Sequence, residues 1–396
     1  MISSADPIVV LGGARTPIGS FGGSLSGVPA HELGAIAVKA ALARAGVAPG
    51  AVDEVVMGCC GQVAGDAYNA RRVALSAGLA DTTPAFTVNR LCGSGVQAVW
   101  SAAQELATGA ADVVVAGGDE NMSRLPFLDF GARDGYRLGH RALLDGTLAV
   151  LTDPFSNVPM GATAEAVAQH YDVSRAAQDE FAAESQRRAA TAEAKAAYAE
   201  EIVAVEIGGR KPKTVTTDEH PKPATTVETL ATLRPAFDKA GTVTAGNSSG
   251  INDGAAGLVL TRASTAAELG LTPLASIVEV TVAAIEPRLL GYAPTFAIRS
   301  LLEREGLGVA DLDSVELNEA FAAQAVAVAR DLGLDPAKTN PYGGAIALGH
   351  PVGATGAILT VRIVLDLIRR DLTQGVVSLC IGGGQGIAML VRRWGA

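Results

Sequence analysis

The sequence predicts an α/β protein built from two similar halves, in which short buried strands alternate with helices. Hydrophobic residues make up 48% of the 396 residues and charged residues 18%, which is the composition of a packed globular protein. Apolar runs typical of buried strands alternate with segments that carry the three-and-four apolar spacing of amphipathic helices. This alternation favours a layered fold with a mostly parallel sheet, and a similar pattern recurs at the two ends of the chain.

The first 118 residues supply most elements of the first half. Short apolar runs predict strands at residues 8–11, 55–57, 85–88 and 111–116. Helical periodicity predicts helices at residues 31–45, 68–77 and 96–106, and Gly46 ends the first of them. Strands and helices therefore alternate, as in a layered α/β domain.

Residues 119–249 break the alternation and are predicted to form an insertion. The stretch 123–160 is irregular, two helices are predicted at 162–170 and 174–198, and a strand follows at 255–260. The resulting boundaries are 1–118 with 250–271 for the first half, 119–249 for the insertion, and 272–396 for the second half.

Residues 208–226, within the insertion, are the most basic stretch of an acidic chain. The basic side chains there are Arg210, Lys211, Lys213 and Lys222, and they outnumber the acidic ones. A solvated loop is the ordinary interpretation of such a stretch. The functional alternative is a site for a phosphate-bearing ligand.

The two ends of the chain resemble each other in sequence pattern. Residues 46–58 and 306–318 share a glycine, an aspartate and an apolar strand in the same order. Cys92 and His350 each open a glycine-spaced turn that leads into a helix, and each helix precedes an apolar strand that ends in glycines. A duplicated fold places these turns opposite each other across a pseudo-twofold axis, so we expect Cys92 and His350 to meet.

These residue types suit acyl transfer through a thiol. Cys92 lies where a strand turns into a helix, and a helix N-terminus favours a thiolate, with His350 available to take the proton. Cys380 ends a strand just before the glycines 382–384 and offers a second thiol for proton transfer at carbon. The N–H groups of that glycine run and of Cys92 are candidates for an oxyanion hole, and Asn318 can hold a water or a carbonyl.

Each of these residues also has an ordinary structural interpretation. A free cysteine is more often a small buried apolar side chain than a nucleophile. Asn318 has the residue type of a helix N-cap, His350 precedes a proline in a turn, and the glycine run could form a phosphate nest. Their joint occurrence at repeat-related positions favours the catalytic interpretation.

Composition excludes several other classes of function. The net charge of −10 and the pI near 5.1 argue against a general nucleic-acid binder. No apolar run is long enough to span a membrane, and Met1–Pro7 shows no targeting signal, so a cytoplasmic protein is expected. The spacing of the four cysteines fits neither a zinc site nor a disulfide framework, and Cys59 and Cys60 are expected to pack in the core as free thiols.

Over essentially its whole length the sequence resembles the thiolases, the acetyl-CoA acetyltransferase and 3-ketoacyl-CoA thiolase family. Five motifs together carry this resemblance and are highly specific: Val88–Gly95 (VNRLCGSG), Thr244–Ala256 (TAGNSSGINDGAA), Asn318–Phe321 (NEAF), Gly343–Pro351 (GGAIALGHP) and Cys380–Gly386 (CIGGGQG).

The resemblance implies a specific reaction and site. Cys92 is expected to be acylated, His350 to activate it, and Cys380 to act as acid and base at the α-carbon of the second substrate. Asn318 is expected to position the water that forms one oxyanion hole with His350, while the N–H groups of Cys92 and Gly382 form the other.

For the substrate, the resemblance implies coenzyme A bound under the inserted loop domain, with no metal or redox cofactor. Ser249 is expected near the pantetheine and Lys222 near the phosphates or adenine. The acyl pocket is expected to be lined by Met160, Phe237, Ala245 and Phe321. The implied fold has two α/β/α/β/α halves, usually assembled as homo-oligomeric tetramers or dimers, with a role in fatty-acid and lipid metabolism.

Some positions depart from the family pattern. Pro159 replaces a histidine that many acetoacetyl-CoA-forming members carry, Gln385 replaces a frequent methionine, and residues 123–158 match poorly. These positions surround the acyl pocket, so the length or branching of the acyl group and the biosynthetic or degradative direction stay open.

Two alternatives to a thiolase fit the sequence less well. A decarboxylating condensing enzyme of the ketoacyl synthase type uses a second histidine or an asparagine where this chain has Cys380. A non-catalytic acyl-CoA-binding relative predicts the loss of Cys92, His350 or Cys380, and the chain keeps all three.

Overall fold

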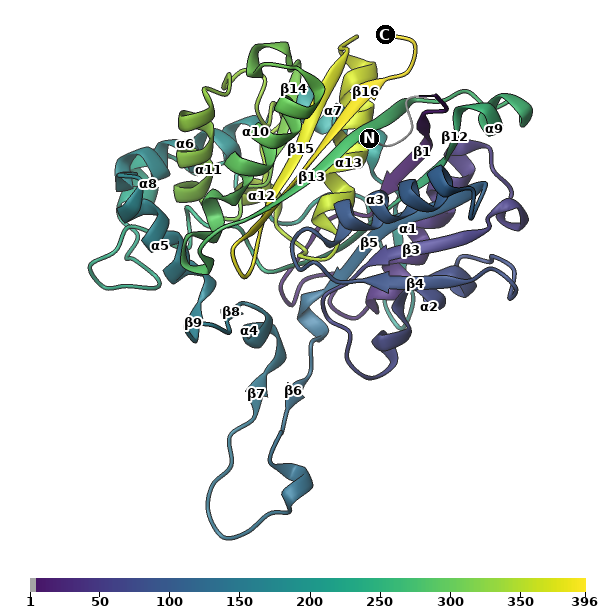
Figure 1. Ribbon diagram of the computed structural model, residues 1–396. Helices are drawn as coiled ribbons and strands as arrows, with labels where there is room; N and C mark the ends of the chain where they lie inside the picture. The colour runs from purple at the N-terminus through teal and green to yellow at the C-terminus, as the bar shows by residue number, and fades with distance from the viewer. Residues whose placement is uncertain (1–4) are drawn as a thin grey trace.

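The fold is organised around ten hydrogen-bonded strands, nine of which follow one path while the tenth, β2 (Gly19–Ser20), lies off it (Figure 1). The structure is a computed structural model that describes residues 5–396, so the first four residues of the segment Met1–Pro7 lie outside it. The strand order along the path is β14 (Ser314–Leu317), β15 (Gln374–Ile381), β16 (Gln385–Arg393), β13 (Ala275–Ala284), β1 (Ile8–Arg15), β12 (Asn252–Arg262), β5 (Val113–Asn121), β3 (Glu54–Gly58) and β4 (Ala85–Val88), while β2 (Gly19–Ser20) pairs with β12.

The predicted repeat is present in three dimensions. The first half runs β4-β3-β5-β12-β1, and the second runs β14-β15-β16-β13, with an isolated parallel bridge from Val315 to Thr339 where β4 would lie. Asp53 accepts hydrogen bonds from the backbone N–H groups at the start of β5, and Asp313 does the same at the start of β15. The same capping device therefore fixes the same strand pair in both halves.

Helices form three layers around the strands of the two halves. The central layer is α3 (Ser94–Thr108) and α13 (Thr355–Arg369), which pack on each other, and α13 packs against strands of both halves. The outer layers are α1 (Ala30–Ala45) and α2 (Asn69–Ser76) on one side, and α10 (Ala293–Glu305) and α11 (Ala322–Leu332) on the other. This is the α/β/α/β/α arrangement that the sequence resemblance implied.

The sheet differs from the mostly parallel one predicted from the sequence. Only β3 with β4 and β5, and β14 with β15, pair in parallel, and the remaining pairs are antiparallel. The periodicity of the sequence shows where strands lie but not their direction. The tight turn between β15 and β16 forces an antiparallel hairpin, which needs no crossover helix.

The chain between β5 and β12 leaves the sheet and returns to it. Its helices are α4 (Gly146–Val150), α5 (Met160–His170), α6 (Arg175–Ala189), α7 (Ala192–Glu201) and α8 (Val227–Ala231). Its short strands pair as β6 (Phe127–Leu128) with β7 (Leu144–Asp145), β8 (Thr152–Asp153) with β9 (Val158–Pro159), and β10 (Val205–Ile207) with β11 (Lys213–Val215). The single helix predicted at 174–198 is two helices, because Thr191 caps α7 by accepting a hydrogen bond from the N–H of Ala194.

Two short helices complete the description, α9 (Ala263–Glu268) and α12 (Ala345–Leu348). Within residues 5–396 no helix combines the length and the apolar character needed to cross a membrane.

Two glycines set the distance between the central helices. A Cβ atom on Gly95 of α3 would lie 2.3 Å from the backbone nitrogen of Ala357 in α13, and one on Gly356 would lie 2.5 Å from the backbone nitrogen of Val96. Backbone therefore packs on backbone where α3 and α13 begin. The turns that precede the two helices carry Cys92 and His350, so this contact holds the two turns together.

We expect Gly95→Ala to lower the free energy of unfolding and to reduce activity. Alanine favours a helix over glycine by about 1 kcal/mol, but the clash with backbone atoms outweighs this gain and costs about 1–3 kcal/mol. Urea unfolding measures the change. Gly50→Ala is the control, because Gly50 is exposed with no atom within 4 Å of an added Cβ. Equal stability of Gly95→Ala and the natural protein would contradict the proposed constraint.

Candidate active site

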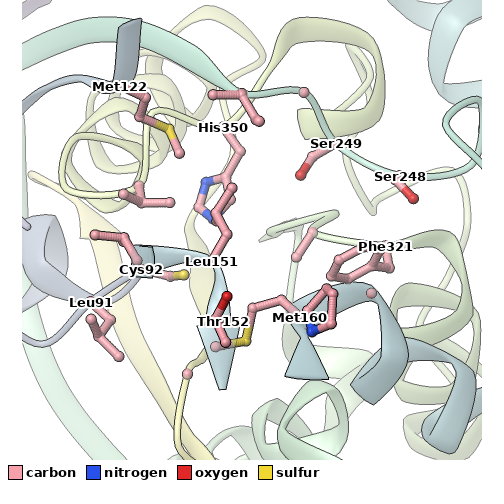
Figure 2. Close-up of a pocket in the computed structure, with 18 of the residues that line it drawn as sticks. Leu91, Cys92, Met122, Leu151, Thr152, Met160, Ser248, Ser249, Phe321 and His350 are labelled. Atoms are coloured by element: carbon pink, nitrogen blue, oxygen red, sulfur yellow. The ribbon is translucent and has the colours of Figure 1, made fainter. Parts of the chain in front are cut away.

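The turns before α3 and α13 open into a cavity of about 490 Å³. Figure 2 shows Cys92 and His350 together on one wall, with Phe321, Ser248 and Ser249 across from them. The residues expected from the sequence that line this cavity are Cys92, His350, Cys380, Gly382, Ser249, Met160, Phe237, Ala245 and Phe321. The structure thus brings together nine of the expected site residues from both halves and from the inserted segment.

The Cys92 turn has a constrained backbone. Leu91 has a φ of 47°, in the left-handed region that a non-glycine residue rarely adopts. The side chain of Asn89 accepts a hydrogen bond from the N–H of Leu91 (2.9 Å). The hydroxyl of Ser94 donates to the carbonyl of Leu91 (2.6 Å) and accepts from the N–H of Arg90 (2.9 Å). These bonds hold the strained turn, and the turn directs Cys92 into the cavity.

Burial controls the protonation of Cys92. It raises the pKa of the Cys92 thiol to about 11, and the backbone N–H groups of Gly382 and of Cys92 itself partly counter this rise. The expectation that the helix N-terminus would make Cys92 a thiolate is therefore wrong, because desolvation outweighs the helix end. Cys92 is a neutral thiol near pH 7, and both N–H groups already point at its sulfur.

His350 is buried, and both of its ring nitrogens and its backbone N–H have a polar neighbour. Its Nδ1 lies 2.7 Å from the Thr355 hydroxyl, its Nε2 lies 3.5 Å from Nδ2 of Asn318, and its N–H donates to the side chain of Asn252 (2.9 Å). Burial lowers the pKa of His350 to about 4, so the imidazole is neutral near pH 7. A neutral imidazole can take a proton.

Asn318 faces His350 and is not a helix N-cap. The N-cap of α11 is Phe321, and Asn318 is 1% exposed with no hydrogen-bond partner for its Oδ1. A buried polar atom without a partner is unusual in a folded protein and marks a place for a water or a ligand atom. Asn318 does not itself line the cavity and reaches it only through His350.

Cys380 ends β15 beside the cavity and is 2% exposed. Burial raises the pKa of its thiol well above the usual range, and a negative charge on the nearby Cys92 raises it further. In the hairpin turn that follows, Gly383 and Gly384 have φ values of 81° and 85°, a conformation that favours glycine. This turn directs the N–H of Gly382 toward Cys92.

Two residues differ in place from the expectation. Cys60 was expected in the core but lines the cavity, near Cys92. Lys222 does not line the cavity. The nearby His220 packs on Gly250, a cavity residue, so the segment that carries Lys222 runs along the edge of the site.

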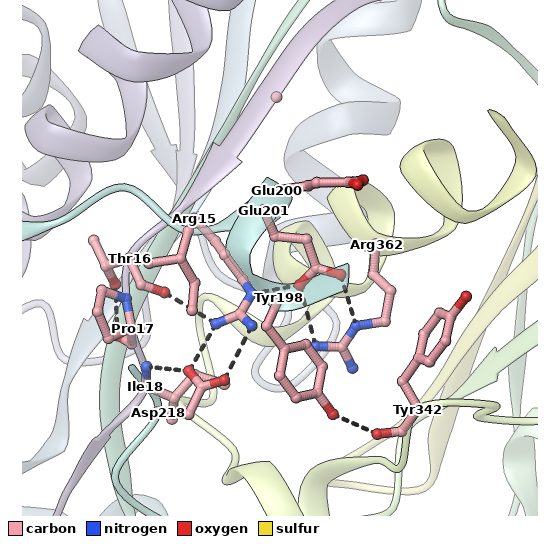
Figure 3. Close-up of polar contacts among 12 residues, drawn as sticks. Arg15, Thr16, Pro17, Ile18, Tyr198, Glu200, Glu201, Asp218, Tyr342 and Arg362 are labelled. Atoms are coloured by element: carbon pink, nitrogen blue, oxygen red, sulfur yellow. Dashed lines mark hydrogen bonds and ion pairs between the residues drawn. The ribbon is translucent and has the colours of Figure 1, made fainter. Parts of the chain in front are cut away.

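A buried cluster of ion pairs joins the segment that carries Lys222 to the rest of the molecule (Figure 3). Arg15 in β1 donates to Glu201 in α7 (2.6 Å) and, with two nitrogens, to Asp218 (2.7 and 3.0 Å). Arg362 in α13 pairs with the same Glu201 (3.3 Å), and both guanidinium groups lie over the Tyr198 ring. The cluster joins the first half, the inserted segment and the second half.

Sequence reasoning missed two residues that orient His350. Thr355 contacts its Nδ1, and Asn252 holds its backbone. Asn252 lies in the Thr244–Ala256 motif, and Thr355 closely follows the motif that contains His350. Their positions in the sequence therefore indicated that both could lie at the site. Residue type did not single them out, since threonine and asparagine are common in turns.

The described residues 5–396 contain no group of three or more His, Cys, Asp or Glu side chains that could hold a metal ion. The reactive groups at or next to the cavity are three thiols (Cys60, Cys92 and Cys380), the neutral imidazole of His350, the amide of Asn318 and several backbone N–H groups.

Comparison with known proteins places this site in a family. The chain matches "Thiolase, N-terminal domain" over residues 8–264 and "Thiolase, C-terminal domain" over residues 271–393. It is 49% identical to the acetyl-CoA acetyltransferase of Cupriavidus necator and 50% identical to the beta-ketothiolase BktB of the same organism, with 98% of this chain and 99% of each relative covered.

Solved structures of other proteins support the same family assignment. The Bacillus anthracis acetyl-CoA acetyltransferase superposes with a TM-score of 0.96 at 44% identity, covering 98% of this chain and 99% of that one. Human mitochondrial 3-ketoacyl-CoA thiolase in complex with CoA superposes with a TM-score of 0.94 at 42% identity, covering 98% of each chain. The chain belongs to the thiolase family and is an acyltransferase of that class.

Proposed function

We propose that Cys92 is the acyl-accepting nucleophile and His350 its base. The Cys92 thiol passes its proton to Nε2 of His350 as the sulfur attacks the thioester carbonyl of an acyl-CoA. Because burial disfavours a free thiolate, proton transfer and sulfur–carbon bond formation occur together. The N–H groups of Cys92 and Gly382 stabilise the oxyanion, and the CoA sulfur leaves with the proton of Cys380. The convergence of Cys92, His350 and Cys380 in one cavity carries this proposal.

Cys380 then acts as the base at carbon. As a thiolate it removes the α-proton of a second acyl-CoA, and the carbanion attacks the acyl carbon on Cys92. Cys92 leaves as a thiolate and recovers its proton from His350. Burial helps here, since a thiol of raised pKa gives a more basic thiolate. Asn318, whose Oδ1 has no hydrogen-bond partner, would hold a water that, with His350, stabilises the oxyanion of this step.

We place coenzyme A along the wall formed by the inserted segment. Ser248 and Ser249 offer hydroxyl groups beside the pantetheine path, and Figure 2 shows them at the cavity surface. The segment that carries Lys222 lies at the edge of the site, where its charge can meet the phosphates or adenine. The insertion 119–249 thus acts as the cover over CoA.

Replacing each thiol separates the two half-reactions. We expect Cys92→Ala to form no acyl-enzyme, and Cys380→Ala to be acylated slowly but to lose condensation. Intact mass spectrometry after incubation with acetyl-CoA measures acylation, and acetoacetyl-CoA formation measures condensation. A Cys92→Ala protein that still trapped a covalent acetyl group would refute the assignment. Cys59→Ala is the control, since Cys59 is buried and does not line the cavity.

We further propose that the acyl group is neutral and aliphatic. Among residues 5–396, no lysine, arginine, aspartate or glutamate lines the cavity, and His350 there is uncharged near pH 7. The wall is largely apolar and includes Leu148, Val150, Leu151 and Pro159 from the segment that matches the family least. A terminal carboxylate on the acyl chain would be buried there without a cation.

This proposal predicts discrimination against a terminal carboxylate. We expect kcat/KM for thiolysis of 3-ketoadipyl-CoA to be at least about a hundredfold below that of 3-ketohexanoyl-CoA, since an unpaired buried charge costs several kcal/mol. The two substrates have acyl chains of equal carbon number, so the comparison isolates the charge. Equal kcat/KM values would show that a cation reaches the chain end.

We also propose that the protein is a homo-oligomer, a dimer or a tetramer. Figure 1 shows the arm around β6 and β7 extending away from the body. Large apolar side chains on this arm are exposed: Phe127, Phe130, Tyr136, Leu138, Leu143, Leu144 and Leu148. A soluble chain rarely leaves such a patch uncovered, and a second copy offers an equally apolar arm.

The arm predicts an assembly that surface substitutions would break. We expect the double variant Phe130→Asp with Leu138→Asp to lower the solution mass, measured by light scattering, by a factor of about two or more. The control is Leu269→Asp, which is half-exposed on α9's C-terminal side. An unchanged mass for the double variant would exclude the arm as the contact.

A further inference from the structure

Glu120, in β5, is a buried carboxylate that the mechanism above does not use. It is 1% exposed. Its Oε2 accepts hydrogen bonds from the N–H groups of Cys60 and Gly353, and its Oε1 accepts from the N–H of Gly61, all at 2.9 Å. A carboxylate is the form that accepts at both oxygens, so the surrounding donors suit the charged side chain.

The donors come from two segments that both reach the active site. Cys60 lines the cavity and belongs to the first half of the chain. Gly353 belongs to the second half and lies in the turn between His350 and α13. A Cβ on Gly353 would lie 2.6 Å from Oε2 of Glu120 and 2.9 Å from the Cα of Cys59. The backbone of the turn at Gly353 therefore packs closely against the carboxylate. Glu120 therefore bridges the two halves at the level of the catalytic turns.

The charge of Glu120 also acts on the cavity. Within the described part of the chain, Glu120 forms no ion pair with an arginine, lysine or histidine; its donors are three backbone N–H groups and the thiol of Cys59 (3.9 Å). Its negative charge contributes to the raised pKa values of Cys92 and Cys60. Burial raises the pKa of Glu120, and the backbone N–H groups of Cys60, Gly61 and Gly353 counter that rise by stabilising its carboxylate. Burial raises the pKa of the neighbouring Asp119 to about 8, so Asp119 is mostly neutral near pH 7.

We propose that Glu120 is a positioning residue of the active site: it fastens the turn after His350 to the Cys60–Gly61 loop and so fixes the imidazole relative to Cys92. This role rests on the proposed function of Cys92 and His350. Asn252 and Thr355 fix the backbone and Nδ1 of His350, and Glu120 fixes the turn that carries both His350 and Thr355.

Two variants separate the effect of the negative charge of Glu120 from the effect of its side-chain length. Glu120→Gln keeps the length but removes the charge and one acceptor, whereas Glu120→Asp keeps the charge but is too short to hold both segments. Asp313→Asn is the matched control, because Asp313 also accepts two backbone N–H bonds (2.9 and 3.2 Å) but lies at the end of β14 away from Asn318. For each protein, kcat, KM, the unfolding temperature and the pH dependence of Cys92 alkylation by iodoacetamide are measured.

We expect both Glu120 variants to lose at least about tenfold in kcat with KM changed less than about twofold, since a small displacement of a catalytic group has such effects. Alkylation of Cys92 should move to lower pH in Glu120→Gln, because a nearby negative charge is gone, and should stay in place in Glu120→Asp. The control should keep its kcat and its alkylation profile.

A purely structural role gives a different pattern. A kcat equal to that of the natural protein in either Glu120 variant would overturn the proposal. The proposal would also be overturned if Asp313→Asn lost as much kcat as the Glu120 variants at an equal drop in unfolding temperature. If Glu120→Gln does not fold, the kcat and KM of Glu120→Asp decide alone. These outcomes are separate from a failure of the proposed function, because Cys92→Ala tests the nucleophile and alkylation of Cys92 requires no turnover.

Discussion

The contact between α3 and α13 is the constraint on which the site depends. The reacting groups lie far apart in the sequence, and no local pattern brings them together. Gly95 and Gly356 allow the two helix beginnings to pack backbone against backbone, and the turns just before them carry Cys92 and His350. The duplication of the fold makes this contact nearly symmetric, while the sequence makes it chemically asymmetric, with a thiol on one side and an imidazole on the other.

Desolvation dominates the electrostatics that follow from this packing. Burial raises the pKa values of Cys92 and Cys380 and lowers that of His350, so each reacting group rests in its neutral form. In the proposed mechanism, charge appears only when a substrate carbonyl arrives, and the backbone N–H groups of Gly382 and Cys92 already point toward the Cys92 sulfur. An uncharged cavity also limits what can enter, which links the proton chemistry to the proposed preference for a neutral acyl chain.

Much of the fold and of the site composition followed from the sequence. Periodicity located most strands and helices of the first half, and the repeat pattern located β14, α13 and β15 of the second. The repeat also predicted that Cys92 and His350 would meet in one cavity, as the structure shows. The prediction of a mostly parallel sheet was wrong, since the apolar runs of strands look alike in parallel and antiparallel sheets. The prediction of a thiolate at Cys92 was also wrong. The start of a helix can be recognised in the sequence, whereas the depth at which Cys92 is buried depends on how the two halves assemble. For the same reason Cys60, Thr355 and Asn252 were not placed in the site.

In the proposed function, the parts that perform the chemistry are separate from the part that shapes the substrate wall. The turns that carry Cys92, His350 and Cys380 are fixed by the central helices and the β15–β16 hairpin. The remaining wall comes from the segment between β5 and β12, which is attached through contacts such as the cluster of Arg15, Glu201 and Arg362. Arg15 and Arg362 project from β1 and α13, elements of the two halves, so this anchor does not depend on the residues that face the cavity. Residues such as Leu148 and Pro159 can therefore change the acyl pocket while the catalytic turns keep their geometry.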